Sequence, residues 1–312
     1  MQNLRWRFGC NTWPELLRQT FPRQDTHSAE AAYFHLKPKM QLEDHLGDII
    51  RKARAMRGVP ARAAAVAAGL TEAEFAAFEE SGVIGKQFNL ASLARALGLD
   101  ETKLAAIAAR WIPRTQNLAR WRRLELIRST AGSNVVNCYL VWDEQSAEAA
   151  LFDVGWHAQP IFSVLEQNRL ELKHVFITHT HNDHIAALDQ IQRRFPNAHL
   201  HAGLAPHSAR QPTCVAGPVE LGRLKISMRP TPGHADDAAS YIVENWPQNA
   251  PAIAVVGDAI FAGSIGWGFS SWQLGLRSVA EQILTLPDDT LICPGHGPLT
   301  TVAEEKAHNP FL

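Results

Sequence analysis

The spacing of apolar residues divides this chain into a front part and a back part with different periods. Between residues 40 and 111, apolar side chains recur every three to four positions in five short consecutive segments. The first segment opens at Met40, and the third runs from a helix-capping Thr71 to Gly82. The front part is therefore predicted to be all-helical.

From about residue 120 the pattern changes to short apolar runs with strand character, separated by amphipathic helices. Strands are expected at 123–130, 134–143, 149–155, 174–179, 199–203, 224–233, 239–245, 251–261 and 290–297. Helices are expected at 158–168, 184–195 and 278–286, and from Thr301 onward. Strands that alternate with helices predict an α/β architecture for this part.

These patterns predict three regions along the chain. Residues 1–39 have no core-forming period, so we expect a poorly structured N-terminal extension that is dispensable, with Met40 as an alternative start of translation. Residues 40–112 are expected to form a small helical domain, and residues 120–312 a larger α/β domain.

The composition is that of an ordinary globular protein and excludes several classes. The 312 residues are 46% hydrophobic and 20% charged, with a formal net charge of −1, which argues against a general polyanion binder. No apolar run is long enough for a transmembrane helix, and the N-terminus lacks the apolar stretch of a secretory signal. The four cysteines are scattered without a CxxC pair. We therefore expect a cytoplasmic protein that does not act at a membrane.

The sequence "THTHNDH" concentrates possible metal ligands at one point. His179, His181, Asp183 and His184 follow directly after the apolar strand "HVFI" and precede a predicted helix. Residues two apart in extended backbone point the same way, so His179 and His181 can face one site, and the two later residues can face it after the chain turns. Four such polar side chains at an apolar junction would be costly without a partner, which favours a metal.

One cluster cannot complete a metal site, because zinc needs three or four ligands per ion. Three further candidates each follow a predicted strand: His234 in "TPGH", Asp258 in "VVGD" and His296 in "PGHG". Glycines beside them allow the backbone to turn tightly and to approach an ion closely.

These motifs, in this order, resemble the metallo-β-lactamase superfamily and within it the glyoxalase II-like (hydroxyacylglutathione hydrolase-like) hydrolases. The resemblance covers about residues 120–312 and rests on "THTHNDH", "TPGH", "GDAIFAGSIG" and "PGHGPLTTVAEEKAHNPF". It implies an αββα sandwich with two zinc ions per chain, or iron or manganese in their place. The residues that it assigns are His179, His181 and His234 to the first ion, Asp183, His184 and His296 to the second, Asp258 as the bridge, and Asp153 of "LFDVG" as a supporting residue behind the ligands.

Such a site implies hydrolysis, in which metal-bound hydroxide attacks an acyl carbonyl. Asp183 is then expected to be catalytic, as a ligand that also aims the hydroxide. The expected substrate is an acyl thioester, although "GSIGWGFSSWQ" lacks the Arg-x-Asp element usual in glyoxalase II relatives and no glutathione-binding helical domain follows His296. The resemblance therefore does not imply glutathione as the thiol. Trp267, Phe269 and Trp272 are expected either to form an apolar pocket wall or to belong to the core.

Other functions stay open at this level. A lactonase or β-lactamase would use the same attack, and a persulfide dioxygenase with a single iron would share His179, His181, His234 and Asp258. The intact set of Asp183, His184 and His296 favours two metals over one. The sequence also leaves a homodimer open.

Residues 42–110 resemble a Cro/C1-type helix-turn-helix domain through "GLTEAEFAAFEESG" and "LARALGLD". That resemblance implies DNA binding, and a DNA-binding regulator with the metal domain as its sensor is the alternative function. Two features argue against it: the expected reading helix carries Glu72, Glu74, Glu79 and Glu80, and residues 41–112 hold nine Lys or Arg against nine Asp or Glu. We expect DNA binding to be weak or absent and the helices to serve as an interaction domain.

Overall fold

The computed structural model describes residues 41–83, 87–203, 212–213 and 217–312. The predicted extension at residues 1–39 lies outside these residues. Residues Met40–Leu312 form one compact unit. Within the described ranges, no helix is long and apolar enough to cross a membrane.

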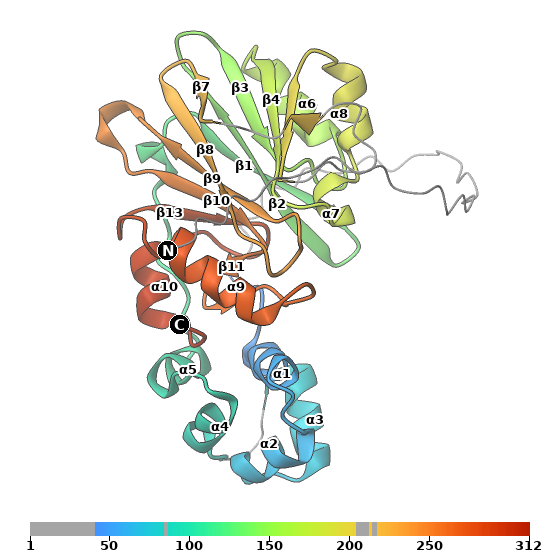
Figure 1. Ribbon diagram of the computed structural model, residues 1–312, viewed down its shortest axis with the longest axis vertical. Helices are drawn as coiled ribbons and strands as arrows, with labels where there is room; N and C mark the ends of the chain where they lie inside the picture. The colour runs from blue at the N-terminus through green and yellow to red at the C-terminus, as the bar shows by residue number, and fades with distance from the viewer. Residues whose placement is uncertain (1–40, 84–86, 204–211, 214–216) are drawn as a thin grey trace, which may run out of the picture. The chain divides into compact units, whose positions relative to one another are not determined.

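Two six-stranded sheets form the centre of this unit (Figure 1). The first sheet runs in sequence order: β1 (Leu124–Ala131), β2 (Asn134–Trp142), β3 (Glu148–Phe152), β4 (Glu171–Ile177), β5 (His199–Ala202) and β6 (Pro212–Thr213). Strands β1 to β3 pair antiparallel, and β3 to β6 pair parallel. Parallel strands need crossover connections, which the helices between β3, β4 and β5 provide.

The second sheet has the order β14-β13-β10-β9-β8-β7. Its strands are β7 (Val219–Leu221), β8 (Leu224–Pro230), β9 (Ala239–Glu244), β10 (Ile253–Gly257), β13 (Leu291–Pro294) and β14 (Thr300–Thr301). Only β10 and β13 pair parallel; the other neighbours are antiparallel. A short hairpin of β11 (Ile260–Phe261) and β12 (Ser264–Ile265) follows β10.

Apolar side chains fill three layers and so produce an αββα sandwich. Phe152 and Phe176 of the first sheet meet Tyr241 of the second in the central layer. Helices α6 (Gln159–Gln167) and α8 (Leu188–Arg194) cover the outer face of the first sheet, and α9 (Trp272–Ser278) and α10 (Val302–His308) that of the second (Figure 1). Because both faces of β2 are covered, seven consecutive residues of this strand are buried. The predicted sandwich is confirmed.

The front part contains five helices with a hydrophobic cluster of their own. They are α1 (Leu46–Met56), α2 (Ala61–Ala68), α3 (Glu72–Ser81), α4 (Leu90–Leu97) and α5 (Glu101–Ala108). Ile49, Phe75 and Leu93 are fully buried in this cluster. Thr71 caps α3 together with Glu74, as its sequence predicted. The all-helical prediction is confirmed, whereas the helix-turn-helix identity and the domain boundaries stay predictions.

The first helix starts later than predicted. It begins at Leu46 rather than at Met40, because the His45 ring accepts a hydrogen bond from the Asp48 amide and Asp48 accepts one from the His45 amide. This reciprocal capping box fixes the N-terminal end of the helix. Glu43 and Asp44 consequently belong to the segment that leads into α1, where they contact the rest of the unit.

The single helix predicted over 184–195 is two helices, α7 (Asn182–Ile185) and α8. The His184 carbonyl accepts hydrogen bonds from the amides of Val154 and Gly155, and the Ala187 amide donates to the Gly155 carbonyl. These bonds to the loop after β3 replace helical ones and break the helix.

The helix predicted over 278–286 begins earlier, at Trp272, and passes into a π-helical turn over Val279–Ile283. In the structure Gly275 lies directly against Gly233, where a side chain on Gly233 would be only 2.2 Å from the Gly275 Cα. This close contact explains the glycine at position 233, whereas a Cβ on Gly275 would be in ordinary contact, 3.6 Å from the Gly233 Cα.

Candidate metal centre

Each predicted ligand lies just beyond the end of a strand, as the sequence indicated. His179 and His181 follow β4, and the next two candidates lie in α7. His234 follows β8, Asp258 follows β10 and His296 follows β13. The two sheets therefore deliver ligands from both sides to one edge of the sandwich.

The structure brings these side chains into three groups whose ligand atoms lie within 4.8 Å of one another. The groups are His179, His181 and His234; Asp183, His184 and His296; and His179, His184 and Asp258.

Asp258 lies between the histidines of both sets. Its Oδ2 atom is 3.5 Å from Nε2 of His234 and 3.5 Å from Nε2 of His296, while its Oδ1 atom is 3.4 Å from Nε2 of His184. A carboxylate in this position can bind two cations at once.

The buried polar atoms here fit a cation. Among the described residues, Nε2 of His179, Nε2 of His184 and Oδ1 of Asp258 are buried without a hydrogen-bond partner. Such atoms are costly unless something else satisfies them. Gly295 leaves room beside them, since a Cβ there would be 2.3 Å from Oδ1 of Asp258 and 2.7 Å from Cε1 of His184.

Oxygen atoms behind the site hold the histidine rings through Nδ1. Nδ1 of His184 is 2.7 Å from Oδ2 of Asp153, Nδ1 of His234 is 2.9 Å from the Trp267 carbonyl, and Nδ1 of His296 is 2.7 Å from the Val135 carbonyl. With Nδ1 engaged, each ring presents Nε2 to the centre, which is the arrangement that metal sites use. Asp153 was predicted for this position; the two carbonyls were not, because backbone oxygens have no sequence signal.

Charges in the cluster shift its protonation strongly. Burial lowers the pKa of His184, but Asp153 and Asp258 outweigh it and raise the pKa to about 10. For His296, burial also lowers the pKa, while the charge of Asp258 and the hydrogen bond with Asp183 raise it to about 11. Burial raises the pKa of Asp183, but the His296 bond and the His184 charge lower it to about 2. The cluster without a cation therefore holds protons that a cation would displace.

The centre opens into a cleft of about 390 Å³. Trp267 and Phe269 line it, and Phe269 is 68% exposed, whereas Trp272 is 7% exposed and belongs to the core. The sequence left open whether these aromatic residues form a pocket wall or belong to the core; in the structure Trp267 and Phe269 line the cleft and Trp272 lies in the core.

Three lining residues that the sequence did not indicate come from the front part of the chain: Glu43, Asp44 and Lys52. A lysine on the otherwise apolar face of α1 was the one signal that could have suggested them.

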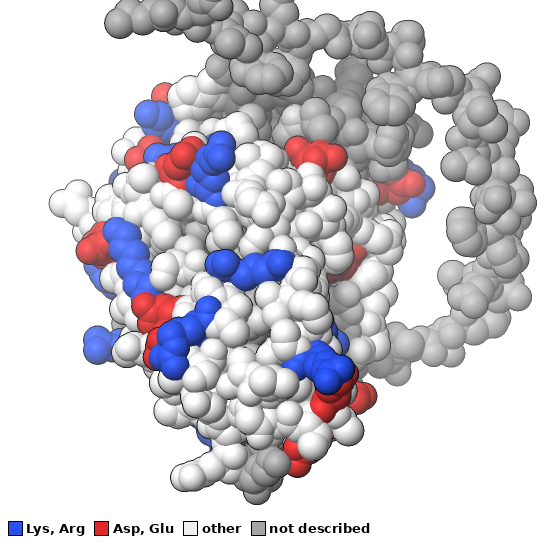
Figure 2. All heavy atoms as spheres, turned by 60° about the horizontal axis from the view of Figure 1, so that its bottom comes forward, with Lys and Arg blue, Asp and Glu red and all other residues white. Residues whose placement is uncertain are grey.

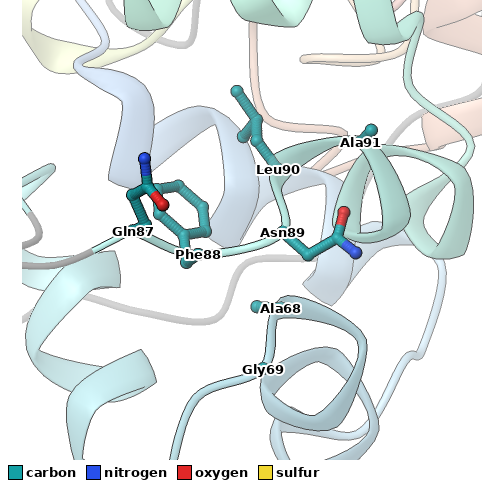
Figure 3. A pocket seen from close by; sticks show the side chains of 7 residues that line it. All are labelled: Ala68, Gly69, Gln87, Phe88, Asn89, Leu90 and Ala91. Carbon is teal, nitrogen blue, oxygen red and sulfur yellow. The ribbon is translucent and has the colours of Figure 1, made fainter.

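A larger hollow of about 550 Å³ lies where α2 ends and α4 begins (Figure 3). Ala68, Gly69 and Asn89 are among the seven residues that line it, and none of the seven is titratable. The Asn89 oxygen already accepts from the Ser92 amide as the cap of α4. The chemistry of the described residues therefore concentrates at the smaller cleft.

Comparison with known proteins agrees with this geometry. Residues 131–212 match the model of the Metallo-beta-lactamase superfamily. The probable metallo-hydrolase YqgX of Bacillus subtilis is 30% identical over 219 residues, which cover 62% of this chain and 97% of that protein. The hydroxyacylglutathione hydrolase GloC of Haemophilus influenzae is 28% identical over 214 residues, covering 61% and 97%.

A solved structure described as the BLEG-1 B3 metallo-beta-lactamase is similar with a TM-score of 0.52 and 27% identity, covering 60% of this chain and 99% of that one. Together with the histidine and aspartate groups, these likenesses indicate a binding site for divalent metal.

Proposed function

This chain belongs to the metallo-beta-lactamase superfamily of metal-dependent hydrolases, and from that premise we propose that it is a binuclear thioester hydrolase. The observation that carries the proposal is the position of Asp258 between two ligand triads. The first triad is His179, His181 and His234, and the second is Asp183, His184 and His296. Zinc is the metal we propose, since imidazole and carboxylate ligands suit it.

Two metals are favoured over one by the second triad. A mononuclear iron dioxygenase would need only the first triad and Asp258, whereas here Oδ2 of Asp183 is 3.2 Å from Nε2 of His296 and both face the same cleft. When bound, two divalent cations would supply an activated water and a Lewis acid for the carbonyl oxygen. Metal content per chain separates these alternatives directly.

The protein's own residues position the reactants. Asp183 accepts a hydrogen bond from the attacking water and so aims it, because its carboxylate is half-buried at the cleft beside His296. Trp267 and Phe269 present apolar rings to the rest of the substrate. His184 is kept in one tautomer by Asp153, which holds its ring in place during the reaction.

The leaving group is the argument for a thioester. An amine must be protonated to leave, whereas a thiolate leaves unaided because the pKa of a thiol is about 8.5. The one ammonium among the described lining residues, Lys52, already donates to Asp44 and to the Ile265 carbonyl. The described lining therefore offers no free ammonium to protonate a departing amine, which favours a thiolate. The name of the H. influenzae relative supports the same class.

The test is a substrate panel with zinc-loaded protein: an acyl thioester, a cephalosporin, an aliphatic lactone, a phosphodiester, and a persulfide with oxygen uptake recorded. We expect the thioester to have the highest kcat/KM, by at least about tenfold, and His181→Ala and Asp258→Ala to lose both metal and turnover. Dominant cleavage of the lactam or the phosphodiester, or oxygen uptake with the persulfide, would refute the proposal.

For the front helices we propose no role as a DNA reader. Arg51 donates to Asp48, Arg54 makes two hydrogen bonds of 2.6 and 2.9 Å to Glu79, and Arg57 donates to the Gly98 carbonyl. On the described part of the face in Figure 2, basic and acidic side chains are interspersed. Arginines that are already paired neutralise few phosphates, so the expected affinity for DNA is low.

A further inference from the structure

Part of the wall of the catalytic cleft comes from outside the αββα sandwich. Glu43 and Asp44 of the segment before α1, and Lys52 within α1, line the cleft together with His181, His296 and the aromatic residues. The backbones touch here: a Cβ on Gly297 would lie 3.0 Å from the Cβ of Glu43 and 3.1 Å from its amide nitrogen. The loop that carries His296 therefore needs a glycine at position 297 for this segment to approach.

Two of these three polar side chains, Asp44 and Lys52, bond to each other and to residues of strand β12. Lys52 is fully buried, and its Nζ lies 2.5 Å from Oδ2 of Asp44 and 2.5 Å from the Ile265 carbonyl. The Ser264 hydroxyl also donates to Asp44. This group holds the segment before α1 against the sandwich and leaves neither charge free for a ligand.

Glu43 differs from the other carboxylates that line the cleft. Asp183 and Asp258 face the histidines, and Asp44 is paired with Lys52. Within the described ranges, no group donates a hydrogen bond to the Glu43 carboxylate and no cation pairs with it. Glu43 is an exposed residue that lines this cleft, and its carboxylate, which has no hydrogen-bond or ion-pair partner among the described residues, is available to a cationic group of a bound molecule.

The surroundings of Glu43 suit an ammonium group on an apolar chain. Phe261, Trp267 and Phe269 line the same cleft, and the rings of Trp267 and Phe269 stack at 6.4 Å. Lys52 Nζ already lies 5.5 Å from the Phe261 ring and 5.9 Å from the Trp267 ring, so these rings do accept a cation nearby. The described lining includes no arginine, and its lysine is engaged, so no side chain is left to pair with a carboxylate of the substrate.

Resting on the thioesterase activity proposed above, we propose that Glu43 makes this enzyme selective for acyl thioesters that carry an ammonium group. Glu43 pairs with the ammonium while Trp267 and Phe269 cover the alkyl chain next to it. The front helices thus act as a specificity element for the metal centre, with Asp44 and Lys52 as positioning residues that hold Glu43 at the cleft.

The experiment compares two pairs of nearly isosteric thioesters with zinc-loaded full-length protein. One pair places the charge on the acyl side: the β-alanyl and butyryl thioesters of N-acetylcysteamine. The other places it on the thiol side: butyrylthiocholine and S-(3,3-dimethylbutyl) thiobutyrate. In at least one pair we expect kcat/KM to favour the cation by about tenfold or more. The primary ammonium of the β-alanyl group can donate a charged hydrogen bond to Glu43, whereas the quaternary ammonium of thiocholine has no N–H and can be attracted only by the carboxylate charge and the aromatic rings.

Glu43→Gln should remove this preference, mainly through a higher KM for the cationic substrate, and Glu43→Asp should keep part of it. Glu101→Gln is the matched control, because Glu101 is a partly exposed carboxylate in α5 that is paired with Arg95 and does not line the cleft. Equal kcat/KM within both pairs, or a preference that survives Glu43→Gln, would overturn the inference.

Binding of β-alaninamide and choline, followed by calorimetry with zinc-loaded protein, gives a readout without turnover. If no thioester is hydrolysed but one of these cations binds at least about tenfold more weakly to Glu43→Gln, the thioesterase proposal fails and recognition by Glu43 stands. If thioesters are hydrolysed and neither cation distinguishes the two proteins, the thioesterase proposal stands and the role of Glu43 is refuted.

Discussion

Replacing Asp153 with asparagine tests whether a buried carboxylate behind the ligands controls metal affinity. Asp153 is 1% exposed; its Oδ2 atom contacts Nδ1 of His184 at 2.7 Å and the Thr178 hydroxyl at 2.8 Å, and its Oδ1 atom accepts from the Thr178 amide at 2.8 Å. The residue has a φ of 54°, a conformation that asparagine adopts as readily as aspartate. The substitution therefore removes charge and one acceptor without straining the backbone.

The expected magnitude follows from these contacts. Three donors meet two carboxylate oxygens, so in asparagine at least one donor faces an NH₂ group instead of an oxygen. A hydrogen bond to a charged group contributes about 1.5–3 kcal/mol. Substitutions behind metal ligands weaken binding by about 10–100-fold, which corresponds to about 1.4–2.8 kcal/mol. We expect a loss in this range for the ion held by His184, and a smaller loss for the other.

Zinc titration of chelator-treated protein, in competition with a chromophoric chelator, measures both dissociation constants. Asp143→Asn is the matched control: Asp143 is 4% exposed and accepts from the amides of Gln145 and Ser146, but it lies in the turn after β2 and does not line the cleft. Two dissociation constants that are unchanged in Asp153→Asn, or that change equally in Asp143→Asn, would refute this role for Asp153.

Four further predictions follow from the same structure. The pKa of His184 is about 10 and that of His296 about 11 without a cation, so zinc binding at pH 7.5 should release about two protons per chain. Zinc affinity should therefore increase as pH rises. Calorimetry in buffers of different ionisation enthalpy measures the number of protons released, and zero release would contradict the prediction. Because their pKa is raised in the fold, protonated His184 and His296 stabilise the metal-free protein, fully below pH 6.5. This stabilisation is lost as pH rises through 10–11, and thermal unfolding measured across that range should record the loss. Lys52→Met should lower the free energy of unfolding by about 3 kcal/mol, since it leaves Asp44 without its buried cation. The double variant with Asp44→Asn should lose less than the sum of the two single losses. A double variant whose loss equals that sum would argue against the pair. The full chain should bind duplex DNA only weakly and without sequence preference near physiological salt, and a sub-micromolar selective complex in an electrophoretic or anisotropy assay would revive the regulator hypothesis.

Local chain geometry made the cluster of candidate ligands predictable from the sequence. His179 and His181 are two residues apart after a strand, and Asp183 and His184 follow the turn, so their nearness depends on only six residues of backbone. The αββα layers were also accessible, because covered strands such as β2 have continuous apolar runs. Helix ends were accessible where a common cap is present, as at Thr71, and missed at His45, which is an uncommon cap.

Long-range contacts decided the rest. The break between α7 and α8 depends on backbone bonds to Val154 and Gly155, which lie about 30 residues earlier in the chain and have no side-chain signature for this role. The spacing of apolar residues places Lys52 in an amphipathic helix but does not predict its burial. The buried ammonium is tolerated because it donates hydrogen bonds to Asp44 and to the Ile265 carbonyl. Glu43 faces the metal cleft because Gly297, 254 positions away (297 − 43), lets two backbones touch. Periodicity describes each element by itself, whereas the meeting of distant elements depends on how they pack, and at this site that packing supplies the residues beyond the ligands.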